Sequence, residues 1–118
     1  MKFFSTLIAL TVLAGRHAVA YNDNCDGSGA AGIALIPADC NDARDSVDTM
    51  KEYKDGTEFS KGTCYVKYAT NGSGDQAVSG QDIVNAMNDI QEQCDPPIGS
   101  RGTGNCDECH VTINYRAA

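Results

Sequence analysis

The sequence predicts a small α+β protein, an α/β-sandwich in which two helices cover one face of an antiparallel sheet. Two stretches, 63–70 and 109–115, alternate apolar and polar residues with the period of half-buried strands. Two others, 38–53 and 79–94, place apolar residues at helical spacing. The chain also contains six cysteines, an even number in a short sequence, which is typical of a fold stapled by disulfides.

The first twenty residues have the features of a secretory signal. Lys2 precedes an apolar run at 3–13, and Ala18-Val19-Ala20 has the small-x-small pattern of a cleavage site. The run is shorter than the ~20 residues that a membrane span needs. We therefore expect a signal peptide at 1–20 and one mature domain at 21–118, secreted to the extracellular space, with no membrane span.

The charge of the chain limits its partners. Sixteen acidic residues against nine basic ones give a formal net charge of −7, and Lys2 and Arg16 would leave with the signal. A mature chain this acidic argues against nucleic acid and anionic lipid surfaces as partners. Because there is no internal repeat, linker or low-complexity segment, we expect a single domain. We also expect a monomer.

The first half of the mature chain is expected to hold one strand and one helix. A polar, glycine-rich lead-in precedes an apolar run at 32–36, which we predict to be a buried strand stopped by Pro37. From 38 to 53 the period becomes helical, and Gly56 is a natural stop. The apolar face of this helix would hold Ala43, Val47 and Met50.

The predicted strand at 63–70 leads into a loop that is dense in turn-forming residues, 71–75. Within it, Asn71-Gly72-Ser73 is the acceptor pattern for N-glycosylation in a secreted protein. The same residues would also serve simply as a turn, because asparagine and glycine adopt the conformations that turns need. Asn71 is therefore a candidate glycosylation site on a loop that should be exposed.

The second helix, at 79–94, has the clearest boundaries in the sequence. Ser79 is expected to cap its start with Asp82 as the capping-box partner, and Asp95-Pro96-Pro97 should end it. A brief strand at 76–78 precedes the helix, and a glycine-rich connector at 98–105 leads to the closing strand. The apolar stripe of the helix would hold Ile83, Met87, Ile90 and Cys94.

The stretch Cys106-Asp107-Glu108-Cys109-His110 fits the patterns of three chemical sites. Covalent haem attachment normally opens a helix, whereas the residues that follow here alternate as a strand. A redox dithiol needs a helix N-terminus to lower its thiol pKa, and the two acidic spacers would raise it. Zinc needs four ligands, and the sequence supplies no convincing second pair. We expect structural half-cystines, with no metal or cofactor.

Catalytic arrangements are poorly represented. His110 is the only histidine outside the predicted signal, and no Gly-x-Ser-x-Gly turn is present, so a Ser-His-Asp triad is not expected. Sixteen acidic residues always allow some carboxylate pair for glycoside cleavage, but the chain lacks Trp and any obvious sugar-stacking groove. We expect a binding protein rather than an enzyme. The alternative of another class is a redox or metal protein that uses Cys106, Cys109 and His110.

Several motifs resemble those of the fungal killer toxins of the killer protein 4 type, and together they cover most of the mature chain. The resemblance implies an α/β-sandwich of split βαβ plan. It also implies a secreted, non-enzymatic toxin that impairs calcium uptake in susceptible cells, with antifungal or plant-directed relatives. The motifs are Asn24-Cys25-Asp26-Gly27-Ser28, Cys64-Tyr65-Val66-Lys67-Tyr68, the Ser79-Gly80 turn before a helix ending in Cys94, and Val111-Thr112-Ile113-Asn114-Tyr115.

The same resemblance implies roles for particular residues. It pairs Cys25 with Cys94, a bridge worth roughly 4 kcal/mol because it closes a long loop. It also indicates Lys61, in the loop before the central strand, as a contact with a surface protein or ion channel of the target cell. The chain differs from the founding toxin in being acidic and in having fewer cysteines.

A second resemblance gives an alternative function. Residues 98–106, together with Gly62-Thr63-Cys64 and Gln81-Asp82-Ile83, are similar to the fungal necrosis-inducing effectors of the extracellular protein 2 type. This resemblance implies an effector directed at plant cells. Both families consist of small, secreted, cysteine-rich proteins, so they agree on the class of protein and differ on its target.

The sequence leaves the pairing of the other four cysteines open. If Cys106 and Cys109 paired only with each other, the small loop would contribute merely about 2 kcal/mol. We therefore expect at least one of them to reach across to Cys40 or Cys64. On this interpretation the closing strand is pinned by its cysteines and acts as a structural clasp rather than a catalytic site.

Overall fold

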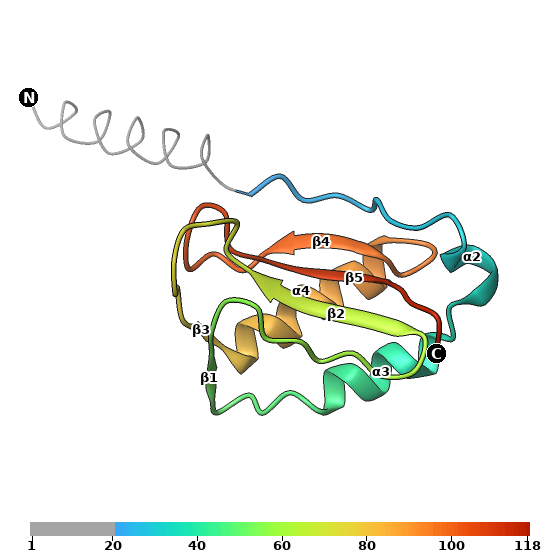
Figure 1. Ribbon diagram of the computed structural model, residues 1–118, viewed down its shortest axis with the longest axis horizontal. Coiled ribbons are helices and arrows are strands. Elements are labelled where there is room, and N and C mark those ends of the chain that lie inside the picture. The colour runs from blue at the N-terminus through green and yellow to red at the C-terminus, as the bar shows by residue number, and fades with distance from the viewer. Residues whose placement is uncertain (1–20) are drawn as a thin grey trace, which may run out of the picture.

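The computed structural model describes residues 21–118; residues 1–20, which hold the predicted signal peptide, lie outside the described part. In that part no helix is long and apolar enough to cross a membrane. Figure 1 shows the arrangement of the elements. In chain order they are α2 (Ala31–Ala34), α3 (Pro37–Asp45), β1 (Glu52–Tyr53), β2 (Cys64–Ala69), β3 (Val78–Ser79), α4 (Gly80–Gln93), β4 (Gly99–Gly102) and β5 (His110–Tyr115).

The main sheet is antiparallel, with the strand order β2-β5-β4. The central strand β5 pairs with β2 in a register that sets Cys64 opposite Tyr115 and Ala69 opposite His110. Since β4 is also antiparallel to β5, β2 and β4 run in the same direction, and α4 lies between them in the chain. This is a split βαβ arrangement, with β5 inserted between two parallel strands.

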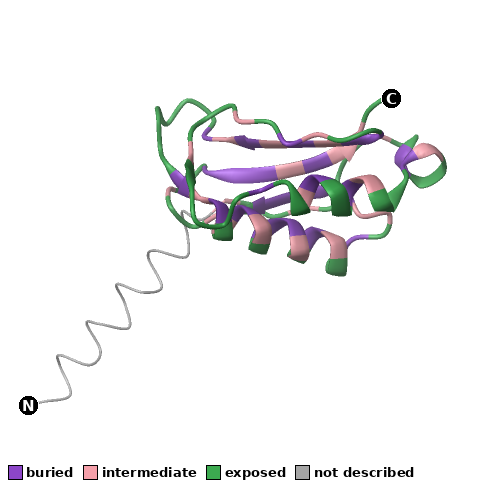
Figure 2. Ribbon diagram, turned by 90° about the horizontal axis from the view of Figure 1, so that it is seen from below, coloured by how far each residue is buried: buried purple, intermediate pink, exposed green. Residues whose placement is uncertain are grey.

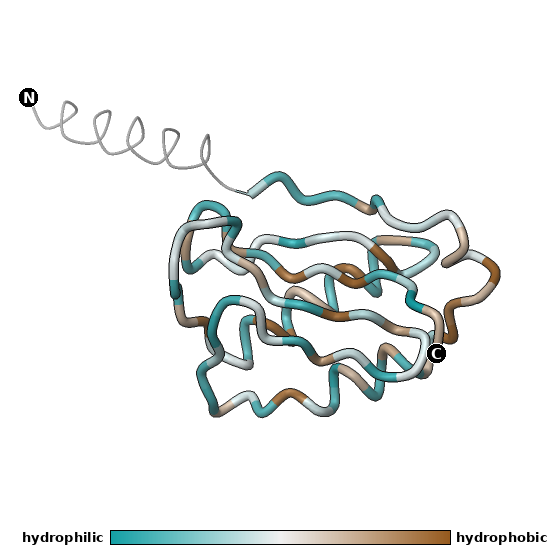
Figure 3. The backbone as a smooth tube through the Cα atoms, in the orientation of Figure 1, coloured by the Kyte–Doolittle hydropathy of each residue, from teal (hydrophilic) through white to brown (hydrophobic). Residues whose placement is uncertain are grey.

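Two helices, α3 and α4, cover one face of this sheet, as Figure 2 shows. α4 packs on β4 and β5, and α3 packs on β2. Apolar residues alternate with polar ones along β2 and β5 (Figure 3), so each strand turns one side to the helices. The predicted α+β sandwich is confirmed. Its buried centre includes Val66, Tyr68, Ile83, Met87, Ile90, Val111 and Ile113.

The long helix α4 forms from the signals that predicted it. The Ser79 side chain accepts a hydrogen bond from the backbone N–H of Asp82 at 3.1 Å, which satisfies one of the unpaired N–H groups of the first turn. Ile83, Met87 and Ile90 are fully buried on one stripe. The helix ends one residue before Cys94.

The apolar run at 32–36 is not a strand, contrary to the prediction. α2 begins at Ala31, and Pro37 starts α3 instead of stopping a strand. Proline is favourable at the first position of a helix because the N–H it lacks would have no partner there. The Ile33 side chain is 94% exposed, so the run does not have the burial that a core strand needs.

The first predicted helix is also shorter than expected, because α3 ends at Asp45. Met50, which was predicted on its apolar face, is 92% exposed. Here the Asp48 carboxylate accepts the backbone N–H of Met50 at 2.9 Å, a local bond that competes with helix formation. Glu52–Tyr53 instead forms β1 and pairs with β3.

The predicted connector at 98–105 contains the strand β4. Its buried residues are glycine, Ser100 and Arg101, which give no apolar alternation in the sequence. Gly99 has a φ of 145°, and a Cβ at this position would collide with the carbonyl oxygen of Asn24. Asn24 and Ser100 exchange backbone hydrogen bonds, so the segment after the predicted signal covers the edge of β4.

Three disulfides join the six cysteines, and no free cysteine remains among residues 21–118. The first is Cys25–Cys94, the pair that the toxin resemblance implies. The second, Cys40–Cys64, joins α3 to β2, and the third closes Cys106 on Cys109. The expectation that Cys106 or Cys109 would reach Cys40 or Cys64 is therefore wrong.

The register of the sheet explains this error. Cys109 directly precedes β5 at the end where Ala69 pairs with His110, whereas Cys64 lies at the opposite end of β2. The six residues of β2 span roughly 17 Å at about 3.3 Å per residue. A disulfide needs Cα atoms within about 7 Å of each other, so Cys109 cannot reach Cys64.

Candidate functional site: the two ends of the sheet

The residues that the sequence analysis singled out fall at opposite ends of the main sheet. At one end of the sheet, where β2 and β4 terminate, lie residues 70–77 and 103–109. We call this end the loop end. At the other end, where these two strands start, lie residues 58–64 and the bridges Cys40–Cys64 and Cys25–Cys94. We call this end the bridge end. Asn71, Cys106 and Cys109 are in the loop end, beside His110, and Lys61 is in the bridge end.

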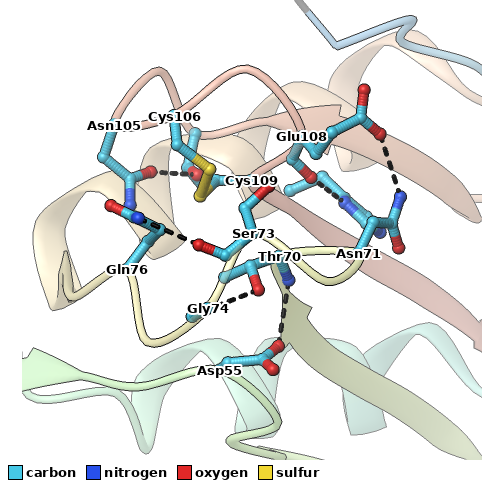
Figure 4. Close-up of a disulfide and its surroundings, with 12 residues drawn as sticks. Asp55, Thr70, Asn71, Ser73, Gly74, Gln76, Asn105, Cys106, Glu108 and Cys109 are labelled. Carbon is cyan, nitrogen blue, oxygen red and sulfur yellow. Dashed lines mark hydrogen bonds between the residues drawn. A yellow bond between two sulfur atoms is a disulfide. The ribbon is translucent and has the colours of Figure 1, made fainter.

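Residues 70–77 form a loop of turns after β2, drawn in Figure 4. Asn71, Gly72 and Gly74 all have positive φ values, between 50° and 88°, which asparagine and glycine adopt most easily. Thr70 holds the base of the loop, because its hydroxyl donates to the carbonyl oxygen of Gly74 at 2.8 Å. Its backbone N–H donates to the carboxylate of Asp55 at 2.9 Å.

The disulfide loop lies beside this turn. The Cys106–Cys109 bond closes a turn in which the Cys109 N–H donates to the Cys106 carbonyl oxygen at 3.3 Å. Cys109 is fully buried and Cys106 is partly buried. Figure 4 shows Glu108, inside the bridged segment, facing Asn71; the Asn71 amide donates to the Glu108 carboxylate at 3.2 Å.

Tyr68 ties the two loops together from inside the sheet. Its side chain is fully buried, and its hydroxyl donates to the carbonyl oxygen of Gln76 while accepting from the Asn105 amide at 2.9 Å. Burial raises the pKa of the Tyr68 hydroxyl, the Asn105 hydrogen bond opposes this, and the charge of Asp55 raises it further. The phenol therefore stays protonated at neutral pH and remains a donor. This role is not evident from the sequence, because Tyr68 has the pattern of any inward-facing strand residue.

His110 lies on the same face of β5 as Thr112 and Asn114, opposite the face that Val111 and Ile113 turn to the helices, and it is buried there. Only 7% of its surface is exposed, and its Nδ1 lies 2.7 Å from the carbonyl oxygen of Glu108. The Tyr21 ring stacks on the imidazole with centroids 4.3 Å apart and planes 9° from parallel. These contacts orient the ring against a backbone carbonyl and an aromatic side chain. They give His110 no nucleophile to activate.

Lys61 lies at the bridge end, in a tight turn before β2. Lys61 and Cys64 exchange backbone hydrogen bonds of 2.9 and 2.8 Å, with Gly62 at a φ of 49° between them. The Asp39 carboxylate of α3 accepts from both the N–H and the hydroxyl of Thr63, at 2.8 and 2.7 Å. The turn is thus fastened to α3 by a carboxylate and by the Cys40–Cys64 bridge, while the Lys61 side chain is exposed.

The backbone N–H of Thr63 and then its hydroxyl hold the pKa of Asp39 below its ordinary value, with slight opposition from burial. Arg116 completes this end, because its Nε donates to the Gly62 carbonyl oxygen at 2.9 Å. Its guanidinium also lies 3.6 Å from the Glu58 carboxylate. Arg116 was not singled out from the sequence, because its place beside Lys61 depends on the pairing of β2 with β5.

Arg101 is a third residue whose role is not evident from the sequence. It is 7% exposed, and its guanidinium donates to the carbonyl oxygen of Asn24 at 2.9 Å and to the Gln93 side chain at 3.0 Å. One nitrogen also lies 3.6 Å from the Cys94 sulfur. The side chain joins the opening segment, β4 and the end of α4 around the Cys25–Cys94 bridge, which is a structural role.

Among residues 21–118, no three His, Cys, Asp or Glu side chains gather where they could hold a metal ion. The fold and its two ends define a small, disulfide-stapled α+β protein whose cysteines and histidine are engaged in structural contacts. The chain belongs to the Meiotically up-regulated gene family, whose model matches residues 23–118. No curated protein and no solved structure matches the chain. The family match gives no support to either the killer-toxin or the necrosis-effector resemblance.

Proposed function

We propose that the protein is a secreted, non-enzymatic toxin or effector that acts on other cells by binding. The observation that carries this proposal is that its reactive side chains are committed to the fold. All six cysteines are bridged, and His110 is held by a carbonyl and an aromatic ring. Disulfides persist mainly in oxidising compartments, so the bridges favour secretion. The name of the matched family describes when genes are expressed rather than what their products do.

Lys61 is the proposed contact with the target. It lies on a turn whose backbone is fixed to α3 by Asp39 and by the Cys40–Cys64 bridge. Among the described residues, Lys61 has no ion-pair partner within salt-bridge distance. Because the backbone of this turn is already fixed, binding an anionic group there costs little additional backbone entropy. The two toxin-like resemblances point to a surface protein or ion channel of a competitor fungus or a plant cell.

The test is to apply purified mature protein, at micromolar concentration, to a panel of fungi and to plant leaves. We expect growth inhibition with reduced calcium uptake in susceptible fungi; necrosis of leaf tissue alone would instead favour the plant-effector alternative. Absence of any effect across the panel would contradict the proposal. Lys61→Gln should weaken the effect, and Lys54→Gln, at another exposed lysine, is the matched control.

A secreted thiol–disulfide protein is the alternative of another class. One observation favours it: Cys106 and Cys109 bridge each other and Cys106 is partly exposed. The pair precedes a strand, however, and lacks the helix N-terminus that stabilises a catalytic thiolate. Reduction of a disulfide substrate by the pre-reduced protein, lost in Cys106→Ser, would establish this alternative over the binding proposal.

A further inference from the structure

The loop end contains the only Asn-x-Ser/Thr pattern in the sequence, Asn71-Gly72-Ser73. The pattern begins two residues after the end of β2, in the loop of residues 70–77. Every residue from 71 to 77 is exposed. An acceptor asparagine must be reachable and must tolerate a bulky, solvated substituent, and this loop meets both conditions.

The Asn71 side chain is exposed and faces the disulfide loop. Its backbone φ of 50° lies in the left-handed region, where asparagine is enriched. The amide nitrogen Nδ2 has one protein contact, the exposed Glu108 carboxylate at 3.2 Å, and a glycosylated amide would keep one hydrogen for it. The Ser73 hydroxyl makes no hydrogen bond within the described residues. Its backbone holds the turn, because the N–H donates to Thr70 and the carbonyl oxygen accepts from the Gln76 side chain, both at 3.0 Å.

We propose that Asn71 carries an N-linked glycan and that this glycan lies over the disulfide loop 103–109. In the reaction, Asn71 Nδ2 forms a bond to C1 of an oligosaccharide carried on a lipid pyrophosphate. The bond from C1 to the pyrophosphate oxygen breaks, the lipid pyrophosphate leaves, and the amide loses one proton. The donor belongs to the secretory pathway, so the inference rests on the secretion part of the proposed function.

Position determines what the glycan would do. Glu108, which contacts the acceptor amide, lies between the two bridged cysteines, so the first sugar would sit beside the Cys106–Cys109 bond. Cys109 is fully buried, and an attacking thiolate can approach only from the side of Cys106. A glycan at this place shields that approach. It leaves Lys61, at the opposite end of β2, uncovered for a target.

The experiment compares secreted wild-type protein with two variants at one position. Ser73→Ala destroys the acceptor pattern, whereas Ser73→Thr preserves it, and neither alters Asn71, whose positive φ glutamine would adopt less easily. Intact mass before and after treatment with a peptide N-glycosidase should show a glycan on wild type and Ser73→Thr. Ser73→Ala should have the mass of the bare chain.

Opening of the Cys106–Cys109 bond by a limiting small thiol, followed by alkylation and mass spectrometry, tests the shielding. The bond should open faster in Ser73→Ala, and in enzymatically deglycosylated wild type, than in glycosylated protein. Equal rates would overturn the shielding. Wild-type protein in the medium with the mass of the bare chain would overturn the glycosylation and leave secretion standing. Retention of the chain inside the cell would overturn both this inference and the proposed function.

Discussion

The two ends of the main sheet are held by different kinds of link. At the bridge end, the links join segments distant in the chain: Cys25–Cys94 spans 69 residues, Cys40–Cys64 spans 24, and the Asp39 carboxylate fastens the turn at Thr63 to α3. At the loop end, the single bridge joins residues only 3 apart. Turns with positive φ and side-chain hydrogen bonds complete the loop end.

This difference indicates that the two ends contribute differently to the stability of the fold. A cross-link stabilises a fold mainly by lowering the entropy of the unfolded chain, and a longer closed loop loses more entropy. The bridge end should therefore carry most of the stability that the disulfides provide. The loop end is shaped locally, so a modification there has little effect on the rest of the fold.

Removal of the longest bridge should have the largest effect. In Cys25→Ala/Cys94→Ala the unfolded chain regains the freedom of its longest closed loop, and we expect the free energy of unfolding to fall by about 4 kcal/mol. Urea unfolding of the purified, disulfide-bonded protein measures this directly. A loss no greater than that caused by opening the Cys106–Cys109 bridge would contradict the assignment of stability to the bridge end.

Removal of the local bridge should cost less. Cys106→Ser/Cys109→Ser frees a much smaller loop, and we expect a loss of about 2 kcal/mol. The Tyr68 and Asn105 contacts that tie the two loops remain in this variant. Hydrogen exchange should show faster opening confined to residues 103–109; faster exchange throughout β2 and α4 would show that the local bridge supports the whole fold.

Acid should weaken the Asp39 link at the bridge end. Because the folded state lowers the Asp39 pKa, this carboxylate contributes its full stabilisation above its unfolded pKa of about 4. The contribution is lost as the pH falls through the lower, folded pKa. Asp39→Asn lacks this ionisation, so the difference in free energy of unfolding between wild type and variant should decrease below about pH 4. Urea unfolding between pH 7 and pH 2 measures this difference, and a constant difference would contradict the prediction.

Substitution of Lys61 should have the smallest effect on stability. Lys61→Gln removes an exposed charge that has no ion-pair partner among the described residues, so we expect a change within about 0.5 kcal/mol. Its proposed role is in target binding, and the potency against susceptible cells should fall. Unchanged potency in a folded variant would remove Lys61 from the proposed contact.

The strands and the second helix were predictable from the sequence because their burial is one-sided and regular. β2 and β5 alternate, and α4 has both a cap at Ser79 and a fully buried stripe. In contrast, β4 has no alternating apolar pattern that would predict a strand. It buries Ser100 and the hydrogen-bonded guanidinium of Arg101 in place of apolar side chains. The run around Ile33 has the opposite property, being apolar in composition and exposed in the fold.

The candidate site was predictable residue by residue but not in its arrangement. Asn71, Lys61, Cys106 and Cys109 could each be identified as candidates from the sequence. The pairing of Cys106 with Cys109 could not, because it depends on the strand register, which places Cys64 opposite Tyr115 and far from Cys109. The partner of Asp39 is Thr63, 24 residues away, and nothing in the sequence around Asp39 indicates this contact. Contacts of this kind depend on how the elements pack, which no local pattern records.

If the Cys106–Cys109–His110 stretch belongs to the scaffold and the protein acts by binding, as we propose, the effect on target cells should not need the Cys106–Cys109 bridge. The most direct test is a dose–response comparison of secreted wild type and Cys106→Ser/Cys109→Ser on a susceptible fungus or leaf, after both are shown to be folded. We predict that the two proteins have the same potency. Loss of the effect in the folded variant would contradict the claim and assign the activity to the disulfide itself.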